Sequence, residues 1–221
     1  MQNVFSICTR FPGKREKPMN KQNSTIMKLA ETALLAALCY VSFTILQIKI
    51  PVPGGDATSL HIGNTFCVLG ALLLGGWYGG LAGSIGMTIA DLMDPVYITG
   101  APKTFVLKLC IGLITGLVAH KIAKINETND KKYVFKWSLI ASIAGLAFNV
   151  IADPIVGYFY KQYILGQPQE VASILAKLSA GATFVNAIVS TILVVIIYNA
   201  VRPALIKANL IHVHVAAANA K

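Results

Sequence analysis

The chain has 221 residues, of which 55% are hydrophobic and only 13% are charged, against about 25% charged residues in an ordinary soluble domain. This composition excludes a soluble globular protein and predicts an integral membrane protein. The formal net charge of +10 does not indicate a nucleic-acid partner, because the basic residues lie in the tails and in loops between apolar segments, as the positive-inside rule describes.

Long apolar segments recur from residue 25 to residue 203 without a soluble-looking interlude. They leave room for about six spans of roughly 20 residues each. We therefore predict an all-α fold, a single integral membrane bundle of six transmembrane helices formed by residues 25–203. A basic tail at 1–24 and a second tail at 204–221 are predicted to lie in the cytoplasm.

The first predicted span covers residues 25–50, and Pro51 and Pro53 then end it because proline cannot continue the helical hydrogen-bond ladder. Near its start, Ala33 and Ala37 stand four residues apart. Small residues at this spacing allow two helix backbones to approach closely in lipid. The pair predicts either internal packing or a docking surface for another protein.

Residues 51–61, PVPGGDATSLH, are predicted to form an outer loop, because proline and glycine mark turns. The second and third segments, 62–74 and 81–93, are both short for a span and are joined by GGWYGG at 75–80. This pattern predicts a hairpin that neighbouring helices shield from lipid, since irregular backbone is not tolerated in contact with lipid.

The fourth segment is predicted to begin at Pro102 and to run to about residue 122, after an outer connector at 94–101. The lysine-rich stretch 121–136 is expected to be a cytoplasmic loop. The fifth segment, 137–159, contains Pro154, which is expected to kink or end the helix. An outer loop at 166–178 and a sixth segment at 179–201 complete the predicted bundle.

The distribution of basic residues supports this orientation. Fourteen of the nineteen lie in or next to the regions predicted to be cytoplasmic: six in residues 1–28, five in the 121–136 loop and three at the C-terminal end. Such an asymmetry places both termini in the cytoplasm.

Polar residues converge on the outer end of the predicted bundle. Charges at membrane depth are costly and by default mark a functional site, and buried polar groups must be paired or must bind something. An array of amides, acids, lysines and a tyrosine is suited to a small polar organic ligand. The candidate ligand-binding residues are Asn64, Asp91, Asp94, Tyr97, Lys103, Lys108, Asn149, Asp153 and Asn186.

The same residues also permit a purely structural interpretation. Asp91 could pair with Lys108, or Asp153 with Lys103, as ion pairs within the bundle. Asn149 and Asn186 could hydrogen bond to neighbouring helices. Because the polar side chains crowd one end of the bundle, the set as a whole favours a ligand pocket.

The sequence does not favour an enzyme. It contains no HExxH zinc motif, no GxSxG elbow and no P-loop, and its four cysteines lack metal-ligand spacing. We therefore expect no catalytic residue, no metal and no cofactor. Two alternatives stay open at this point, an intramembrane enzyme that uses Asp91, Asp94 and Lys108, and a non-transporting membrane scaffold.

Several stretches resemble the S components of energy-coupling factor (ECF) transporters, in particular the riboflavin-transporter-like group. They are the basic tail, TALLAALCYV with Ala33 and Ala37, the segment HIGNTFCVLGALLLGGWYGGLAGSIG, and APKTFVLKLCIGLITGLVAHKI. The resemblance covers about residues 24–202. It implies six helices, cytoplasmic termini, a bacterial plasma membrane and a vitamin site near the outer face, formed and closed by the loops 51–61, 94–101 and 166–178.

The resemblance also implies partners, namely a transmembrane T subunit and two cytosolic ATPases whose ATP hydrolysis drives uptake. The alanine motif of the family's first helix, which contacts the T subunit, is matched by Ala33 and Ala37. Family ligands include riboflavin, thiamine and its pyrimidine precursor, biotin, folate, pantothenate and B6 vitamers. Riboflavin is favoured on family grounds, whereas Asp91 and Asp153 would suit a cationic B6 vitamer or aminopyrimidine equally well.

Overall fold

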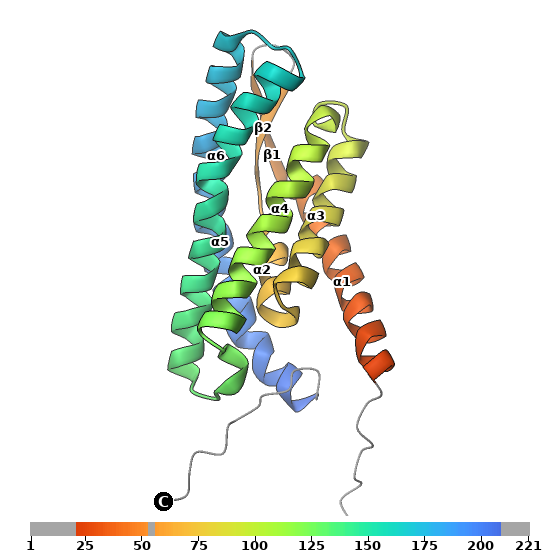
Figure 1. The fold of residues 1–221 in the computed structure, drawn as a ribbon, viewed down its shortest axis with the longest axis vertical. Coiled ribbons are helices and arrows are strands. Elements are labelled where there is room, and N and C mark those ends of the chain that lie inside the picture. The colour runs from red at the N-terminus through yellow and green to blue at the C-terminus, as the bar shows by residue number, and fades with distance from the viewer. Residues whose placement is uncertain (1–20, 53–55, 209–221) are drawn as a thin grey trace, which may run out of the picture.

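The computed structural model describes residues 21–52 and 56–208 as a bundle of helices with one small β-hairpin (Figure 1). Short π-helical turns at Leu117–Ile122 and Tyr160–Ile164 extend α4 and α5, and 3₁₀ turns form at Ile98–Gly100 and Ile125–Glu127. The main elements are α1 (Lys21–Thr44), β1 (Gln47–Val52), β2 (Asp56–His61), α2 (Gly63–Leu74), α3 (Gly76–Met93), α4 (Ala101–Gly116), α5 (Lys131–Phe159) and α6 (Gln169–Lys207).

Four helical stretches are long and apolar enough to cross a membrane, namely Thr25–Thr44, Ile98–Glu127, Lys131–Ile164 and Gln169–Lys207. The helical fold class is therefore confirmed. Helix α2 is shorter, although it is apolar, and the count of six membrane spans stays a prediction. The first turns of α1 and the last turns of α6 lie at the same end of the bundle, and the β-hairpin lies toward the other (Figure 1).

The region after the first helix differs from the prediction. Helix α1 ends at Thr44, and residues 47–61, predicted as the end of a helix followed by a loop, form an antiparallel hairpin that pairs Lys49 with Ser59 and Gln47 with His61. Ile48 and Ile50 alternate with polar neighbours, which is the period-two pattern of a strand. The sequence of residues 47–52 therefore does indicate a strand, but most of this segment was included in the apolar first span.

The predicted connector at 75–80 is also wrong. Only Gly75 interrupts the helices, with a φ of 97°, and Gly76–Met93 is one continuous helix. The glycines that look like a flexible loop instead permit close packing. A Cβ added to Gly112 of α4 would lie 2.2 Å from the Cα of Gly80 in α3, and one added to Gly116 would lie 2.1 Å from the amide nitrogen of Gly76.

Helix α5 begins earlier than predicted, and α6 is longer than predicted at both ends. Helix α5 begins at Lys131 and continues through Pro154 to Phe159, so this proline does not end it. Helix α6 begins at Gln169, which reduces the predicted outer loop 166–178 to a short connection. The side chains of Ala172 and Leu175, both buried, anchor this additional first part of α6 in the bundle.

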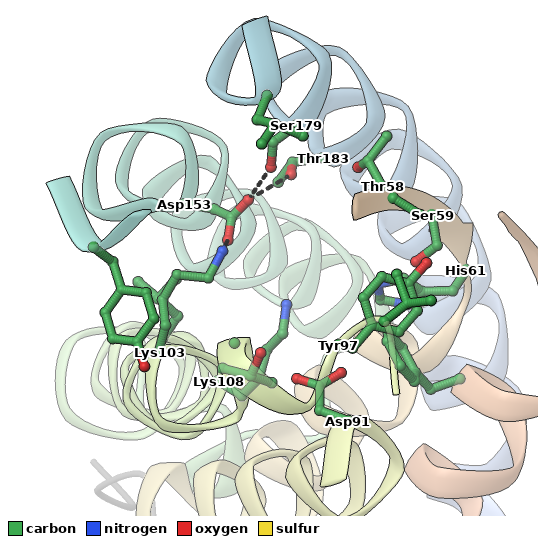
Figure 2. A pocket seen from close by; sticks show the side chains of 18 of the residues that line it. Thr58, Ser59, His61, Asp91, Tyr97, Lys103, Lys108, Asp153, Ser179 and Thr183 are labelled. Atoms are coloured by element: carbon green, nitrogen blue, oxygen red, sulfur yellow. Dashed lines mark hydrogen bonds and ion pairs between the residues drawn. The ribbon is translucent and has the colours of Figure 1, made fainter. Parts of the chain in front are cut away.

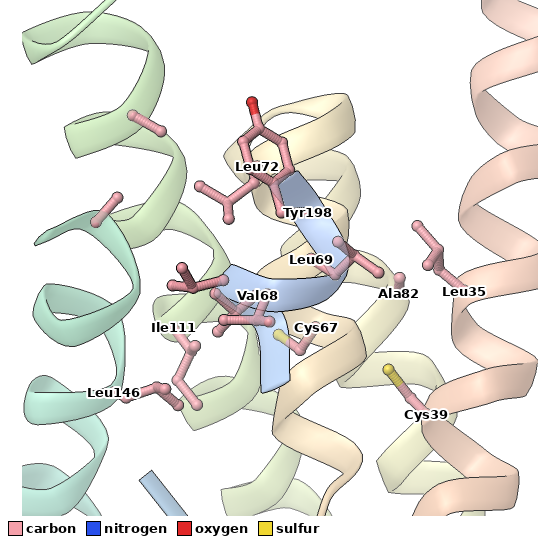
Figure 3. Close-up of a cluster of buried hydrophobic side chains, with 14 of the residues drawn as sticks. Leu35, Cys39, Cys67, Val68, Leu69, Leu72, Ala82, Ile111, Leu146 and Tyr198 are labelled. Carbon is pink, nitrogen blue, oxygen red and sulfur yellow. The ribbon is translucent and has the colours of Figure 1, made fainter. Parts of the chain in front are cut away.

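The core of the bundle surrounds α2. Its residues Cys67, Val68 and Leu72 are fully buried and pack with Ile111 of α4 and Tyr198 of α6 (Figure 3). Because the other helices enclose it, α2 need not span the membrane on its own. Cys39 and Cys67 are free and buried, and Cys110 is free, whereas Cys8 lies outside the described residues.

Candidate ligand-binding site

A cavity of about 140 Å³ lies among the polar residues at the hairpin end of the bundle. It is lined by side chains from β2, every helix from α2 to α6, the end of α1, and the connections after α3 and α5. Eight of the nine predicted ligand-binding residues are in this lining: Asn64, Asp91, Tyr97, Lys103, Lys108, Asn149, Asp153 and Asn186.

Asp153 on α5 lies at the centre of a polar cluster in which both of its carboxylate oxygens have protein partners. Its Oδ1 pairs with Lys103 Nζ of α4 at 2.9 Å, and its Oδ2 accepts hydrogen bonds from the hydroxyls of Ser179 and Thr183 on α6 (Figure 2). This is one of the two ion pairs that the sequence allowed. Because both oxygens already have partners within the protein, Asp153 balances Lys103 and is not left to neutralise a cationic ligand.

In the side-chain amide of Asn186 on α6, both the oxygen and the nitrogen also form hydrogen bonds within the protein. Its Oδ1 accepts a hydrogen bond from the His61 N–H at 3.0 Å, and its Nδ2 donates to the Ser59 carbonyl at 3.0 Å. The amide thus pairs with the backbone of β2 much as a neighbouring strand would. Asn186 lines the cavity, but in this arrangement its hydrogen bonds hold the hairpin against α6.

A second group of side chains is left uncommitted. Lys108 is only 8% exposed and extends into the space between the Asp153 cluster and Asp91 (Figure 2), yet its ammonium makes no hydrogen bond or ion pair within the described part of the chain. The predicted Asp91–Lys108 ion pair is not formed in the described part of the chain, although both side chains line the cavity.

The amides of Asn64 and Asn149 are also without protein partners. Both residues are almost fully buried, and the Oδ1 atom of each lacks a hydrogen bond among the described residues. A buried amide left unpaired costs about 1–3 kcal/mol. Together with the Lys108 ammonium, these amides give the cavity unused hydrogen-bonding capacity that a polar ligand would satisfy.

Asp94 does not line the cavity. It follows the last residue of α3, pairs with Lys49 of β1, and accepts a hydrogen bond from the Val96 N–H. Partial burial raises the pKa of Asp94, but these two hydrogen bonds outweigh burial and hold the pKa below its ordinary value of 3.8. Asp94 therefore secures β1 to the end of α3 and lies outside the set of cavity-lining side chains.

An aromatic contact continues this attachment into the cavity wall. Lys49 Nζ lies 5.4 Å from the ring centroid of Tyr97, and Phe43 packs edge-on against both Tyr97 and His61. Burial and the nearby Lys108 ammonium lower the pKa of His61 to about 3, so its imidazole is neutral at physiological pH. Consistently, His61 Nδ1 accepts a hydrogen bond from the Gly63 N–H at 3.2 Å.

Several cavity residues are missing from the sequence-based set. Ser179 and Thr183 precede Asn186 by seven and three residues on α6, a spacing that places all three on one helical face, and this signal was present in the sequence. Thr58, Ser59 and His61 belong to the segment 51–61, which the family resemblance placed at the site, but which of its side chains face the cavity depends on the hairpin that was not predicted. The remaining polar additions are Thr99, Thr104, Tyr160 and Lys161.

The structure does not assemble the residues of the enzymatic alternative into one site, because Asp91 and Lys108 line the cavity but Asp94 is paired with Lys49 outside it. Among the described residues, no group of three His, Cys, Asp or Glu side chains is placed to hold a metal ion. On α1, Ala33 and Ala37 are both exposed on the outer surface of the bundle.

Comparison with known proteins supports a transport family. Residues 23–203 match the family model described as ECF-type riboflavin transporter, S component. Among solved structures, ThiT from Listeria monocytogenes matches 83% of this chain and 98% of its own, with a TM-score of 0.57 and 20% sequence identity, a likeness that concerns the fold. A search of curated proteins finds no significant match. From the family match over most of its length, the chain belongs to the S components of ECF-type riboflavin transporters.

Proposed function

We propose that this chain is the substrate-capture subunit of an ECF-type transporter and binds a vitamin or vitamin precursor at the outer face of a bacterial plasma membrane for ATP-driven uptake. The observation that carries the proposal is the convergence of eight sequence-predicted polar residues on one cavity of an otherwise apolar bundle. Family membership supports transport over the enzymatic and scaffold alternatives.

The proposed orientation places the cavity outside and both termini inside. The hairpin end of the bundle lies opposite the first turns of α1 and the last turns of α6 (Figure 1), and the basic residues concentrate toward the termini and the 121–136 segment. The sequence contains no P-loop, so the energy for uptake is proposed to come from two cytosolic ATPases acting through a transmembrane T subunit.

Riboflavin is the ligand that the family description favours. The cavity of about 140 Å³ is close in size to the engineered 150 Å³ protein cavity that holds a single benzene ring. A three-ring flavin would therefore need the hairpin or the neighbouring connections to move outward. A single-ring B6 vitamer or aminopyrimidine would fit with less movement.

The experiment that tests the proposal is ligand identification on the purified full chain. Mass spectrometry of material released from the protein should detect a bound vitamin, and calorimetry should show saturable binding of at least one vitamin from a complete set. Neutralising Asp91 as Asn should weaken that binding, whereas a scaffold would show a change in stability alone. Failure of every vitamin to bind would overturn the proposed function.

A further inference from the structure

The charge lining the cavity discriminates among ligand classes. Three lysines line it, Lys103, Lys108 and Lys161, against two carboxylates, Asp91 and Asp153. Lys103 is paired with Asp153, whereas Lys108 forms no ion pair in the described part of the chain. A cationic ligand would add to the charge at Lys108, a neutral ligand would leave that charge unpaired, and a ligand with one negative charge would pair with it.

Lys108 is the position at which a negative charge is lacking. Asp153 is occupied by Lys103, Ser179 and Thr183, and Asp91 forms no ion pair with Lys108. A buried ammonium without a hydrogen-bonded counter-charge is costly. A ligand oxyanion at Lys108 Nζ would remove that cost, and charge-assisted bonds of this kind are roughly twice as strong as neutral ones.

The uncommitted neighbours specify the rest of the ligand. Asn64 and Asn149 each offer an amide Oδ1 that no described residue engages, and the Asp91 carboxylate lines the cavity as a further acceptor. These groups complement hydroxyl or amide N–H donors. We propose that the ligand is a small organic acid with a single carboxylate, which pairs with Lys108, and with hydroxyl or amide groups that reach Asn64, Asn149 and Asp91.

This inference rests on the proposed function, since it names the chemical class of the captured vitamin. It changes the preference within that function from a neutral flavin, or a cationic B6 vitamer or aminopyrimidine, to an acid. Size favours a small acid over a three-ring flavin, because the acid enters the cavity with less displacement of its walls, and the charge at Lys108 separates the acid from a cationic single-ring vitamer.

The test compares pairs of ligands that differ only at the acid group. Nicotinate with nicotinamide, pantothenate with pantothenol, and biotin with biotinol are titrated into the purified full chain by calorimetry, alongside riboflavin, pyridoxine and thiamine. At least one acid should bind, and its neutral counterpart should bind about 10- to 100-fold more weakly, as expected for loss of a hydrogen bond to a charged group.

Two variants locate the effect. Lys108→Met should reduce the preference for the acid over its neutral counterpart to about threefold or less, and Lys177→Met, at an exposed lysine of α6 outside the cavity lining, should retain it. The paired ligands on the unaltered chain provide the decisive comparison even where Lys108→Met fails to fold. Riboflavin or a cation binding while none of the acids binds would overturn this inference and leave the proposed function standing.

Equal binding of an acid and its neutral counterpart would also overturn the inference, as would an unchanged preference in a folded Lys108→Met variant. Absence of binding by every compound would instead count against the proposed function itself.

Discussion

The polar side chains that line the cavity differ in whether they are hydrogen bonded to other parts of the protein. Asp153 and Asn186 form hydrogen bonds with other parts of the protein, whereas the Lys108 ammonium and the Oδ1 atoms of Asn64 and Asn149 have no partner among the described residues. Proximity to the cavity therefore does not by itself identify a ligand contact. The first pair positions the walls, and the second group is left to recognise what enters.

The two hydrogen bonds between Asn186 and β2 can be tested to show whether this residue positions the hairpin or contacts the ligand. Asn186→Leu removes both hydrogen bonds to β2 and leaves the His61 N–H without its acceptor, at a cost of about 1–3 kcal/mol. We expect faster hydrogen exchange in the hairpin peptide 47–61 even without ligand, measured by mass spectrometry. Asn199→Ala, at the other end of α6, should leave that exchange unchanged. Unaltered exchange in Asn186→Leu would show that the hairpin is held by other means.

Residue spacing within one helix was sufficient to predict part of the site, and pairing between helices was not. Asn149 and Asp153 are one turn apart and do share the cavity. The partners of each side chain depend on how six helices are rotated about their axes, which no local pattern specifies. The sequence therefore allowed both the Asp91–Lys108 and the Asp153–Lys103 ion pair, and only the assembled bundle shows that the second forms while Lys108 makes no ion pair among the described residues.

At the scale of elements, the hairpin joins two helices across the cavity. Its β1 edge is attached to the end of α3 by Lys49 and Asp94, and its β2 edge is attached to α6 by Asn186. Lys49 and Ser59 are directly opposite in the strand register, so the two attachments act at the same level of the hairpin. The β1 attachment is the more solvent-accessible of the two, with Lys49 43% exposed.

The β1 attachment should therefore depend on pH. Because the folded pKa of Asp94 is depressed, its pairing stabilises the hairpin above the ordinary carboxyl pKa of about 4 and is lost as the pH falls through the lower folded value. Exchange in peptide 47–61, corrected for intrinsic rates, should rise about two- to fivefold below that range. Asp94→Asn should show the faster exchange at neutral pH, and Glu127→Gln, which breaks a surface pair at the other end, should not.

The contact between α3 and α4 depends on glycine. Gly112→Ala would place a Cβ 2.2 Å from the Gly80 Cα, so the helices must separate, at a cost of about 1–3 kcal/mol. Gly181→Ala is the matched control on α6, where an added Cβ meets no atom within 4 Å, and it should stabilise the helix by about 0.5–1 kcal/mol. Thermal unfolding in detergent measures both changes. Equal melting temperatures for the two variants would contradict close packing at Gly112.

The sequence predicted the long apolar helices well. It was misleading where glycine or proline, which usually interrupt helices, occur within a helix. Residues 75–80 are rich in glycine and were predicted as a loop, but the close approach of α4 requires those glycines within a helix. Pro154 was expected to kink or end α5, and the helix continues beyond it. The error at residues 75–80 arose because a local preference was overruled by packing against a neighbouring helix.

For the whole molecule, the exposed face of α1 is the surface proposed to meet the transport machinery. Ala33 and Ala37 lie there beside exposed Leu34 and Leu38. Ala33→Leu combined with Ala37→Leu fills the close-approach surface and should abolish co-purification of a T subunit while ligand binding is retained. Ala200→Leu, at an exposed alanine on α6, is the control. Retained co-purification in the double variant would exclude this helix face as the docking site.

The hydrogen bonds that hold the hairpin to Asn186 affect which residues of β2 can change during evolution. Both hydrogen bonds go to main-chain atoms, the Ser59 carbonyl and the His61 N–H, which any residue except proline at the second position can supply. Side chains along β2 can therefore be substituted while the strand keeps its hydrogen bonds to Asn186. A duplicated gene could acquire a new cargo by substitutions at Thr58 or Ser59, while the rest of the bundle keeps its architecture.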